Sequence, residues 1–207
     1  MSAIHGPIVT LLVGRDKKPF QVHRDILCSK SDYFSHLLPA HNFSDLTLDA
    51  DPATVALFVN FLYWQHYTLP RSCRDKSEQI FTHARLYILG AHFRMARLQE
   101  EALTKIYELV KGESRCDDRR LELLREVYIS IAAPEDELKK LLVETVAARW
   151  LDYREDLTFE SELGMLMEEF PVFMRDVLGR LGNGEIPTPP QYFVQPKGIK
   201  RKMPDCD

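Results

Sequence analysis

The sequence lacks any apolar run of about eighteen residues, the length that a membrane-spanning helix needs. Its opening residues, MSAIHGPIVTLLVG, also lack a basic lead, and the apolar run at 8–13 is too short for the core of a signal peptide. Neither a spanning segment nor a secretion signal is therefore predicted, and we expect a cytoplasmic or nuclear protein with no membrane partner.

Cysteine and glycine are both scarce. The four cysteines, at positions 28, 73, 116 and 206, are too far apart for a C-x-x-C pair or a zinc ribbon. Without a secretion signal they are expected to be reduced thiols. The nine glycines form no phosphate-binding loop, and no G-x-S-x-G or Walker pattern occurs. These absences predict a protein that is not an enzyme and that uses no cofactor.

Histidine and cysteine come together once, where Cys28 precedes His36 and His41. A structural zinc site needs four closely placed ligands, and here a fourth is missing while Pro39 interrupts any shared helix face. We therefore expect solvated histidines and no metal. An enzyme with Cys28 or the histidines acting is the rival hypothesis, although a free cysteine more often packs in a core.

The net charge of −4 is unevenly distributed. Residues 1–110 carry 12 basic and 11 acidic side chains, whereas residues 111–182 carry 11 and 17. No broad basic face of the kind that binds nucleic acid strongly is present. The basic segment KGIKRK at 197–202 supports only an alternative function, a nuclear regulatory protein with weak nucleic-acid contact through its tail.

Hydrophobic periodicity predicts strands first and helices afterwards in residues 1–110, which is an α+β arrangement. Residues 8–13 are nearly all apolar, which predicts burial on both faces, and 8–23 form a hairpin around the turn GRDKKP. A third strand is expected at 44–50. The expected helices cover 24–28, 32–38, 52–64, 78–91 and 95–110, with Ser31 and Asp51 as caps and Pro39 as a stop.

The rest of the chain is predicted to be helical and then irregular. After the polar break KGESRCDD at 111–118, apolar spacing indicates four helices between 121 and 181. Residues 183–207 contain five of the twelve prolines and no periodicity, which predicts disorder. The expected divisions are 1–110, a helical extension at 111–182 and a tail at 183–207.

Three blocks in order resemble the BTB/POZ domain, over residues 7–110. VGRDKKPFQVHRDILCSKSDYF carries the matching Phe20, His23, Leu27 and Ser31. LTLDADPATVALFVNFLYWQHYTL is similar to the family's strand, helix and tyrosine-rich corner, and ARLYILGAHFRMARLQEEAL to its penultimate pair of helices. The resemblance, which is to the short stand-alone proteins of filamentous fungi, implies a small sheet with a helical cluster, followed by an all-helical extension.

The resemblance implies that Phe20, His23, Leu27 and Ser31 are structural rather than reactive. A histidine at a strand-to-helix corner can hydrogen-bond the free backbone groups of the helix end, which agrees with that role. In relatives an arginine at the place of Arg24 pairs across a dimer groove with an acid at the first strand. This chain has no acid there.

The resemblance further implies a protein partner and the role of adaptor or scaffold, with recruitment of substrates to a cullin-type ubiquitin ligase as its specific form. A strand-swapped homodimer is not expected, because only about seven residues precede residue 8, and they span at most ~25 Å.

Aromatic side chains are dense in the 52–67 region, and those at its end are expected to be exposed. Exposed aromatic residues are enriched in protein interfaces. We therefore predict a protein interface formed by Trp64, His66, Tyr67, Leu69 and Arg24.

Overall fold

A three-stranded sheet forms from the first 50 residues: β1 (Ile8–Val13), β2 (Lys18–His23) and β3 (Asp45–Leu48). The order is β2-β1-β3, with β1 antiparallel to β2 and parallel to β3. Gly14 turns the hairpin at φ +70°, a conformation that costs glycine little. The predicted hairpin is confirmed, and the third strand is shorter than the predicted 44–50.

β1 is buried on one face only, so the prediction of burial on both faces is wrong. Val9, Leu11 and Val13 are buried, whereas Ile8 is exposed and Thr10 is half-buried. An apolar run alone cannot distinguish a strand covered on both faces from one whose second face is partly wet. The α+β class, a small sheet with helices, is confirmed.

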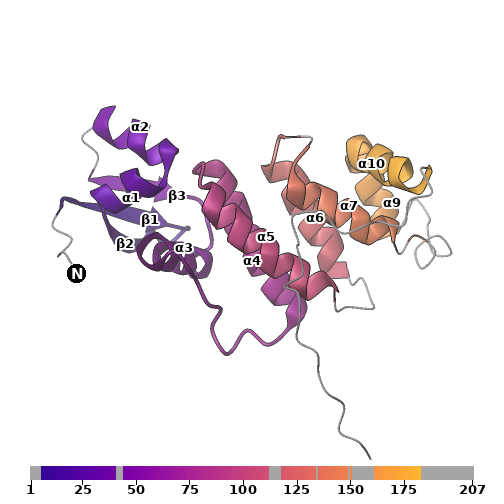
Figure 1. The fold of residues 1–207 in the computed structure, drawn as a ribbon, viewed down its shortest axis with the longest axis horizontal. Coiled ribbons are helices and arrows are strands. Elements are labelled where there is room, and N and C mark those ends of the chain that lie inside the picture. The colour runs from indigo at the N-terminus through magenta and orange to yellow at the C-terminus, as the bar shows by residue number, and fades with distance from the viewer. Residues whose placement is uncertain are drawn as a thin grey trace, which may run out of the picture.

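Helices make up most of the remaining described structure. The computed structural model describes residues 6–40, 44–111, 118–133, 135–148, 150 and 161–182 (Figure 1). Its helices are α1 (Arg24–Lys30), α2 (Asp32–Ala40), α3 (Pro52–Trp64), α4 (Lys76–His92), α5 (Ala96–Lys111), α6 (Asp118–Ser130), α7 (Glu137–Ala147), α9 (Glu162–Glu169) and α10 (Pro171–Gly182).

The predicted helix caps are present. The Phe34 backbone N–H donates to the Ser31 hydroxyl at the start of α2, and Thr54 N–H donates to the Asp51 carboxylate at the start of α3. Each bond satisfies an amide that the helix itself leaves free. α2 continues to Ala40, so Pro39 lies inside its last turn rather than ending it.

An aromatic cluster joins the first helices to the end of α4. The ring centroid of Phe93 lies 4.7 Å from that of Phe34 and 5.4 Å from that of Phe58. The Ser31 hydroxyl also donates to the Phe93 carbonyl oxygen at 2.6 Å. Ser31 therefore fixes both the start of α2 and the position of α4.

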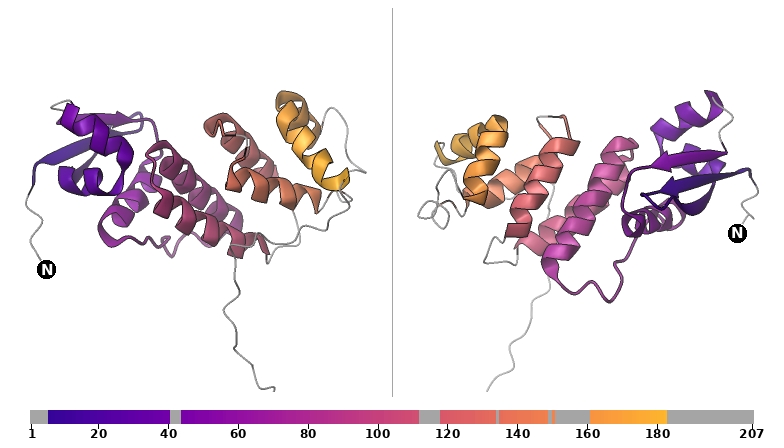
Figure 2. Two further views of the ribbon diagram at one scale, coloured as in Figure 1. Left: turned by 45° about the horizontal axis from the view of Figure 1, so that its top comes forward. Right: turned by 180° about the vertical axis from the view of Figure 1, so that it is seen from behind.

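α4 and α5 form a closely packed pair in the middle of the molecule. Gly90 permits this approach, because a Cβ there would lie 2.9 Å from the Gln99 Cγ and 3.3 Å from the Gln99 amide nitrogen of α5. The two helices separate the sheet, at one end, from α9 and α10 at the other (Figures 1 and 2).

The later helices continue the same core. α6 packs against α4 and α7 against α5, and the buried apolar side chains form one cluster from Val9 to Val177. The Tyr87 hydroxyl of α4 donates to the Asp136 carboxylate at 2.9 Å, and Asp136 caps α7. No described helix is long and apolar enough to cross a membrane.

Candidate functional site

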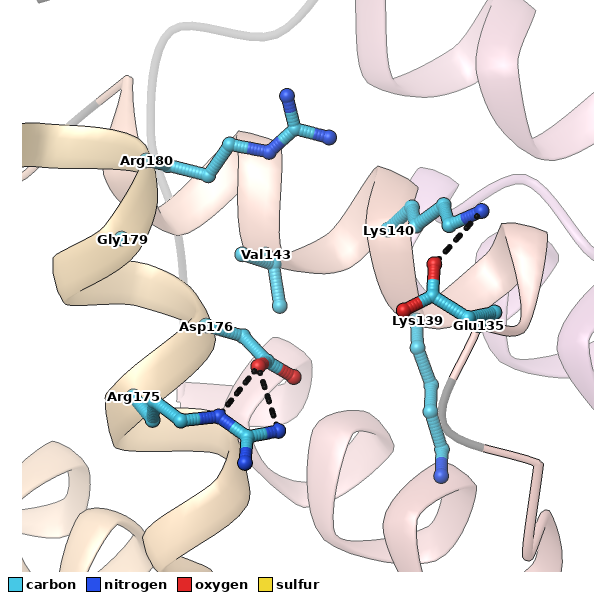
Figure 3. A pocket seen from close by; sticks show the side chains of 8 residues that line it. All are labelled: Glu135, Lys139, Lys140, Val143, Arg175, Asp176, Gly179 and Arg180. Carbon is cyan, nitrogen blue, oxygen red and sulfur yellow. Dashed lines mark hydrogen bonds and ion pairs between the residues drawn. The ribbon is translucent and has the colours of Figure 1, made fainter. Parts of the chain in front are cut away.

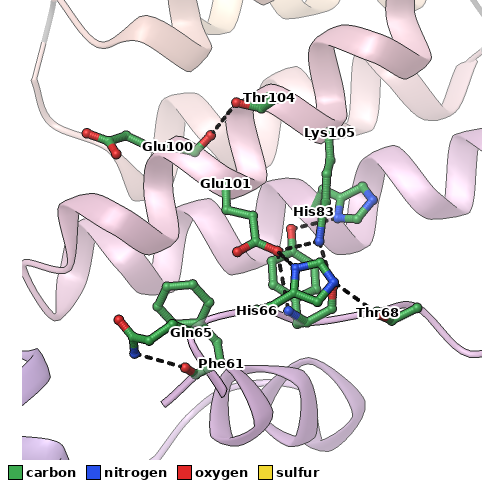
Figure 4. Close-up of polar contacts among 10 residues, drawn as sticks. Phe61, Gln65, His66, Thr68, His83, Glu100, Glu101, Thr104 and Lys105 are labelled. Carbon is green, nitrogen blue, oxygen red and sulfur yellow. Dashed lines mark hydrogen bonds and ion pairs between the residues drawn. The ribbon is translucent and has the colours of Figure 1, made fainter. Parts of the chain in front are cut away.

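Trp64, in the last turn of α3, carries the most exposed large apolar side chain of the described residues. It is 76% exposed, whereas Phe58, Phe61 and Leu62 of the same helix are buried. Gln65 ends the helix in the left-handed conformation, at φ 55°, and its amide side chain donates to the Phe61 carbonyl oxygen at 3.2 Å (Figure 4). The exposed indole therefore stands on a well-anchored helix end.

The segment that follows Trp64 is tied to α4 and α5 by a partly buried polar network (Figure 4). The Tyr67 hydroxyl lies 2.8 Å from His83 Nδ1, and Lys105 Nζ donates to the Tyr67 carbonyl oxygen at 2.6 Å. One Glu101 carboxylate oxygen lies 2.5 Å from Lys105 Nζ and 2.9 Å from His66 Nδ1.

Burial keeps the central pair of this network neutral. It lowers the pKa of His83 to about 4, helped by the Lys105 charge and opposed by that of Glu101. Burial and the Glu101 charge together raise the pKa of Tyr67 far above its usual range. At neutral pH, the two side chains therefore form a neutral hydrogen-bonded pair that fixes the backbone beside Trp64.

The structure divides the predicted interface residues. Trp64 and His66 are exposed, as predicted, and Leu69 is half-buried. The expectation that Tyr67 is exposed is wrong: its side chain is 1% exposed, because α4 and α5 supply polar partners for it. Tyr67 supports the surface and cannot present its ring to a partner. The interface role of Trp64, His66 and Leu69 stays a prediction.

Arg24 is held within its own chain. Its guanidinium donates to the Leu38 carbonyl oxygen and its backbone N–H to the Pro7 carbonyl oxygen. It is half-buried at the start of α1. Its predicted place in a protein interface stays a prediction.

The four residues predicted to be structural all lie at the corner between β2 and α2. Leu27 and Ser31 are buried, and Phe20 and His23 are half-buried. The predicted partner of His23 is wrong: its ring does not cap α1, and its Nδ1 lies 2.7 Å from the Tyr63 hydroxyl of α3. Because Tyr63 lies 40 positions after His23, tertiary packing rather than the local sequence brings the two side chains together.

A groove lies at the C-terminal end of α3, where Phe61 and Gln65 line it, and we call it the α3-end groove. Its volume is about 380 Å³. The lining side chains come from α1, α3 and the start of α5, and they are Ser29, Lys30, Phe61, Gln65, Met95, Ala96 and Arg97. Sequence reasoning missed this groove, because its elements are brought together only by the fold.

A second groove, of about 390 Å³, lies between α7 and α10 (Figure 3). We call it the α7–α10 groove. Its charged side chains are Glu135, Lys139, Lys140, Arg175, Asp176 and Arg180. Figure 3 shows Lys140 directed at Glu135 and Arg175 directed at Asp176, with nitrogen–oxygen distances of 3.3 Å in both pairs.

Among the described residues, no hydrogen bond joins a cysteine thiol to a histidine, and no metal-binding cluster occurs. The Cys28 thiol lies 3.6 Å from the Phe34 carbonyl oxygen, and His23 contacts Tyr63 instead. Burial and the nearby Glu78 and Asp75 raise the pKa of Cys73, which disfavours the reactive thiolate.

Some predicted features fall on positions that the structure does not describe. His41, Cys116, Cys206 and the tail at 183–207, including KGIKRK, lie outside the described residues. Among those that are described, no group of three potential metal ligands occurs.

Comparison with known proteins agrees with the geometry of the first half. No curated protein matches the chain. The BTB/POZ family comprises protein–protein interaction modules and, in general, not enzymes. The sheet, the helices that follow it and the surface at the end of α3 all lie in or beside the segment that matches this family. Residues 9–103 of the chain match the family described as BTB/POZ domain.

Proposed function

We propose that this protein is an adaptor or scaffold that binds a protein partner through Trp64 and its neighbours His66 and Leu69. We call these three residues the α3-end surface. The recruitment of substrates to a cullin-type ubiquitin ligase is the specific form of this role that we propose. No step of it makes or breaks a covalent bond.

The observation that carries the proposal is the exposure of Trp64 on a rigid support. Tryptophan is enriched among the residues that dominate binding energy, and burying its large ring against a partner removes much apolar surface from water. The bonds that fix Gln65 and Tyr67 hold the adjoining backbone in place before binding. Less conformational freedom is therefore lost when a partner arrives.

The BTB/POZ match supports the cullin form of the role, because a cullin partner is what the resemblance to that family implies. α6 and α7, which pack on α4 and α5, supply the helical extension that an adaptor would use to hold a second protein. The loop at 65–75 contains Arg71 and Arg74 and differs from the hydrophobic and acidic pattern of cullin-binding relatives. The cullin partner is therefore the part of the proposal most in need of a direct test.

The adaptor role is tested by affinity capture with the full chain and two substitutions. Trp64→Ala removes the proposed anchor, and Ile129→Ala removes an apolar side chain that is 67% exposed on α6. We expect Trp64→Ala to lose the specific partners of the wild type and Ile129→Ala to keep them, with light scattering reporting self-association. Equal loss from both variants, or none from either, contradicts the proposed surface.

The cullin form of the role has its own test. The purified chain is mixed with the amino-terminal region of a cullin and separated by size-exclusion chromatography with light scattering. A one-to-one complex that Trp64→Ala weakens at least tenfold supports the role. No complex at micromolar concentrations rejects the cullin partner but leaves the adaptor role standing.

A further inference from the structure

The α3-end groove contains two basic side chains and no acidic one. Lys30 comes from the end of α1 and Arg97 from the first turn of α5, and both are exposed. Neither forms an ion pair or a side-chain hydrogen bond with any residue that the structure describes. Two positive charges therefore face one groove without a negative charge lining it.

The α7–α10 groove has nearly the same volume but the opposite arrangement of charge. Lys140 lies 3.3 Å from Glu135, Arg175 lies 3.3 Å from Asp176, and Arg180 lies 3.1 Å from Glu144. Its remaining cation, Lys139, donates to the Ile131 carbonyl oxygen at 2.5 Å. Only the Arg180–Glu144 pair joins two helices, but each of the four cations has a partner within the chain. At the α3-end groove, Lys30 and Arg97 have no such partner among the described residues, so both are available to a ligand.

The apolar part of the α3-end groove suits a peptide. Phe61 and Met95 line it although both are almost fully buried, and Ala96 is exposed there. Trp64 does not line the groove itself, but it is exposed and lies next to Gln65 in the sequence and three residues after Phe61, both of which do line it. An aromatic platform next to two cations is complementary to an apolar side chain flanked by carboxylates.

We propose that the α3-end groove binds an acidic peptide segment of a partner protein. Its carboxylates face Lys30 and Arg97, and one apolar side chain packs on Trp64. Arginine and carboxylate can form two parallel, charge-assisted hydrogen bonds, which gives this arrangement direction as well as attraction. The inference rests on the proposed function, and it deepens it by giving the chemistry of the partner.

The charge pattern favours a peptide over a nucleic acid. The affinity of a protein for nucleic acid grows with the number of phosphates that it neutralises, and two cations neutralise about two. An oligonucleotide is therefore included in the test as a competing ligand.

The test uses fluorescence anisotropy with the full chain and two labelled six-residue peptides, EELFEE and KKLFKK. We expect the acidic peptide to bind at least tenfold more tightly than the basic one. The charge-reversal variant Lys30→Glu/Arg97→Glu is expected to weaken binding of the acidic peptide at least tenfold and to tighten binding of the basic one. Trp64→Ala is expected to weaken binding of both.

The matched control is Arg15→Glu/Lys18→Glu, which changes the net charge equally. Arg15 lies in the β1–β2 turn and Lys18 begins β2, and Gly14 of this turn lies beside Pro52 at the opposite end of α3 from Trp64. We expect this control to bind the acidic peptide like the wild type. Thermal unfolding shows whether each variant is folded, and Lys30→Gln/Arg97→Gln provides a milder change if charge reversal unfolds the chain.

The inference is overturned if both peptides bind equally, if the two pairs of substitutions act alike, or if a labelled single-stranded oligonucleotide binds more tightly than the acidic peptide. Failure of the proposed function is a separate result. If Trp64→Ala still loses the captured partners while charge reversal does not, the adaptor role stands and the acidic partner is rejected. If Trp64→Ala loses nothing, both are rejected.

Discussion

The two regions of the molecule satisfy their polar groups in different ways. In residues 6–111, a buried network around Tyr67 and His83 holds the backbone, while Lys30 and Arg97 lie exposed with no partner among the residues that the structure describes. In residues 118–182, the cations of the α7–α10 groove are paired within the chain. The difference separates charges that are paired within the chain from charges that are available to another molecule.

The largest predicted effect tests whether the later helices belong to the common core. Phe173 is fully buried in α10, whereas Leu178 of the same helix is 44% exposed. We expect Phe173→Ala to lower the free energy of unfolding by about 3–5 kcal/mol and Leu178→Ala by less than about 1 kcal/mol. Urea denaturation followed by circular dichroism measures both.

The shape of that transition also tests the proposed division at 110. One transition, shifted as a whole by Phe173→Ala, indicates that 111–182 unfolds together with the first region. Two separate transitions, of which Phe173→Ala shifts only one, indicate an independent domain. A loss below about 1 kcal/mol for Phe173→Ala contradicts the packing of α10.

A pH effect is expected from the first region. The pKa of His83 falls from 6.5 to about 4 on folding, so the unfolded chain takes up its proton at a higher pH than the folded chain does. Stability is therefore full above pH 6.5 and falls as the pH drops towards 4, by on the order of 3 kcal/mol from this group. His83→Gln removes this proton and can keep a hydrogen bond to Tyr67.

We expect the stability of the wild type to fall more steeply than that of His83→Gln between pH 7 and pH 4. Denaturation at a series of pH values measures the two slopes. Taking their difference cancels groups that both proteins share, such as Glu144, whose pKa is raised by burial. Parallel slopes contradict the buried neutral state of His83.

A buried lysine gives a smaller effect in the second region. Lys139 donates to the Ile131 carbonyl oxygen, its Nζ lies 4.7 Å from the centre of the Tyr128 ring, and burial lowers its pKa. Lys139→Met leaves that carbonyl without its donor and is expected to cost about 1–3 kcal/mol. Lys30→Met, at the α3-end groove, is expected to change the free energy of unfolding by less than about 0.5 kcal/mol. Equal losses of stability in the two variants would contradict the distinction between charges held within the chain and charges available to another molecule.

The smallest expected effect is that of an exposed ion pair. Arg125 Nε lies 2.8 Å from Glu169 Oε2, but both side chains are about one-third or more exposed. A double-mutant cycle with Arg125→Ala and Glu169→Ala is expected to give a coupling energy below about 1 kcal/mol. A larger value would mean that this pair, rather than apolar packing, holds α9 on α6.

Local patterns were sufficient for much of the fold. The hairpin followed from its turn residues, and the start of α3 followed from Asp51 and Pro52, because caps and turns depend on neighbours in the sequence. The exposure of Trp64 was also predictable, since it ends a helix whose apolar face lies elsewhere.

Long-range packing explains what the sequence did not predict. Tyr67 is buried because His83 and Lys105 come from two later helices, and His23 bonds Tyr63, 40 residues away. The α3-end groove is lined by both Lys30 and Arg97, which lie far apart in the sequence, and no local pattern connects them. A fourth such contact, between Tyr87 and Asp136, links the two regions.

The most direct test of the central claim is site-specific photo-cross-linking in cells of the protein's source. A photoreactive phenylalanine analogue is introduced at Trp64 in one variant and at Ile129, similarly exposed on α6, in another. The account predicts a discrete protein adduct from position 64 that position 129 does not give. Adducts from position 129 alone, or the same weak pattern from both, would contradict a binding surface at the end of α3.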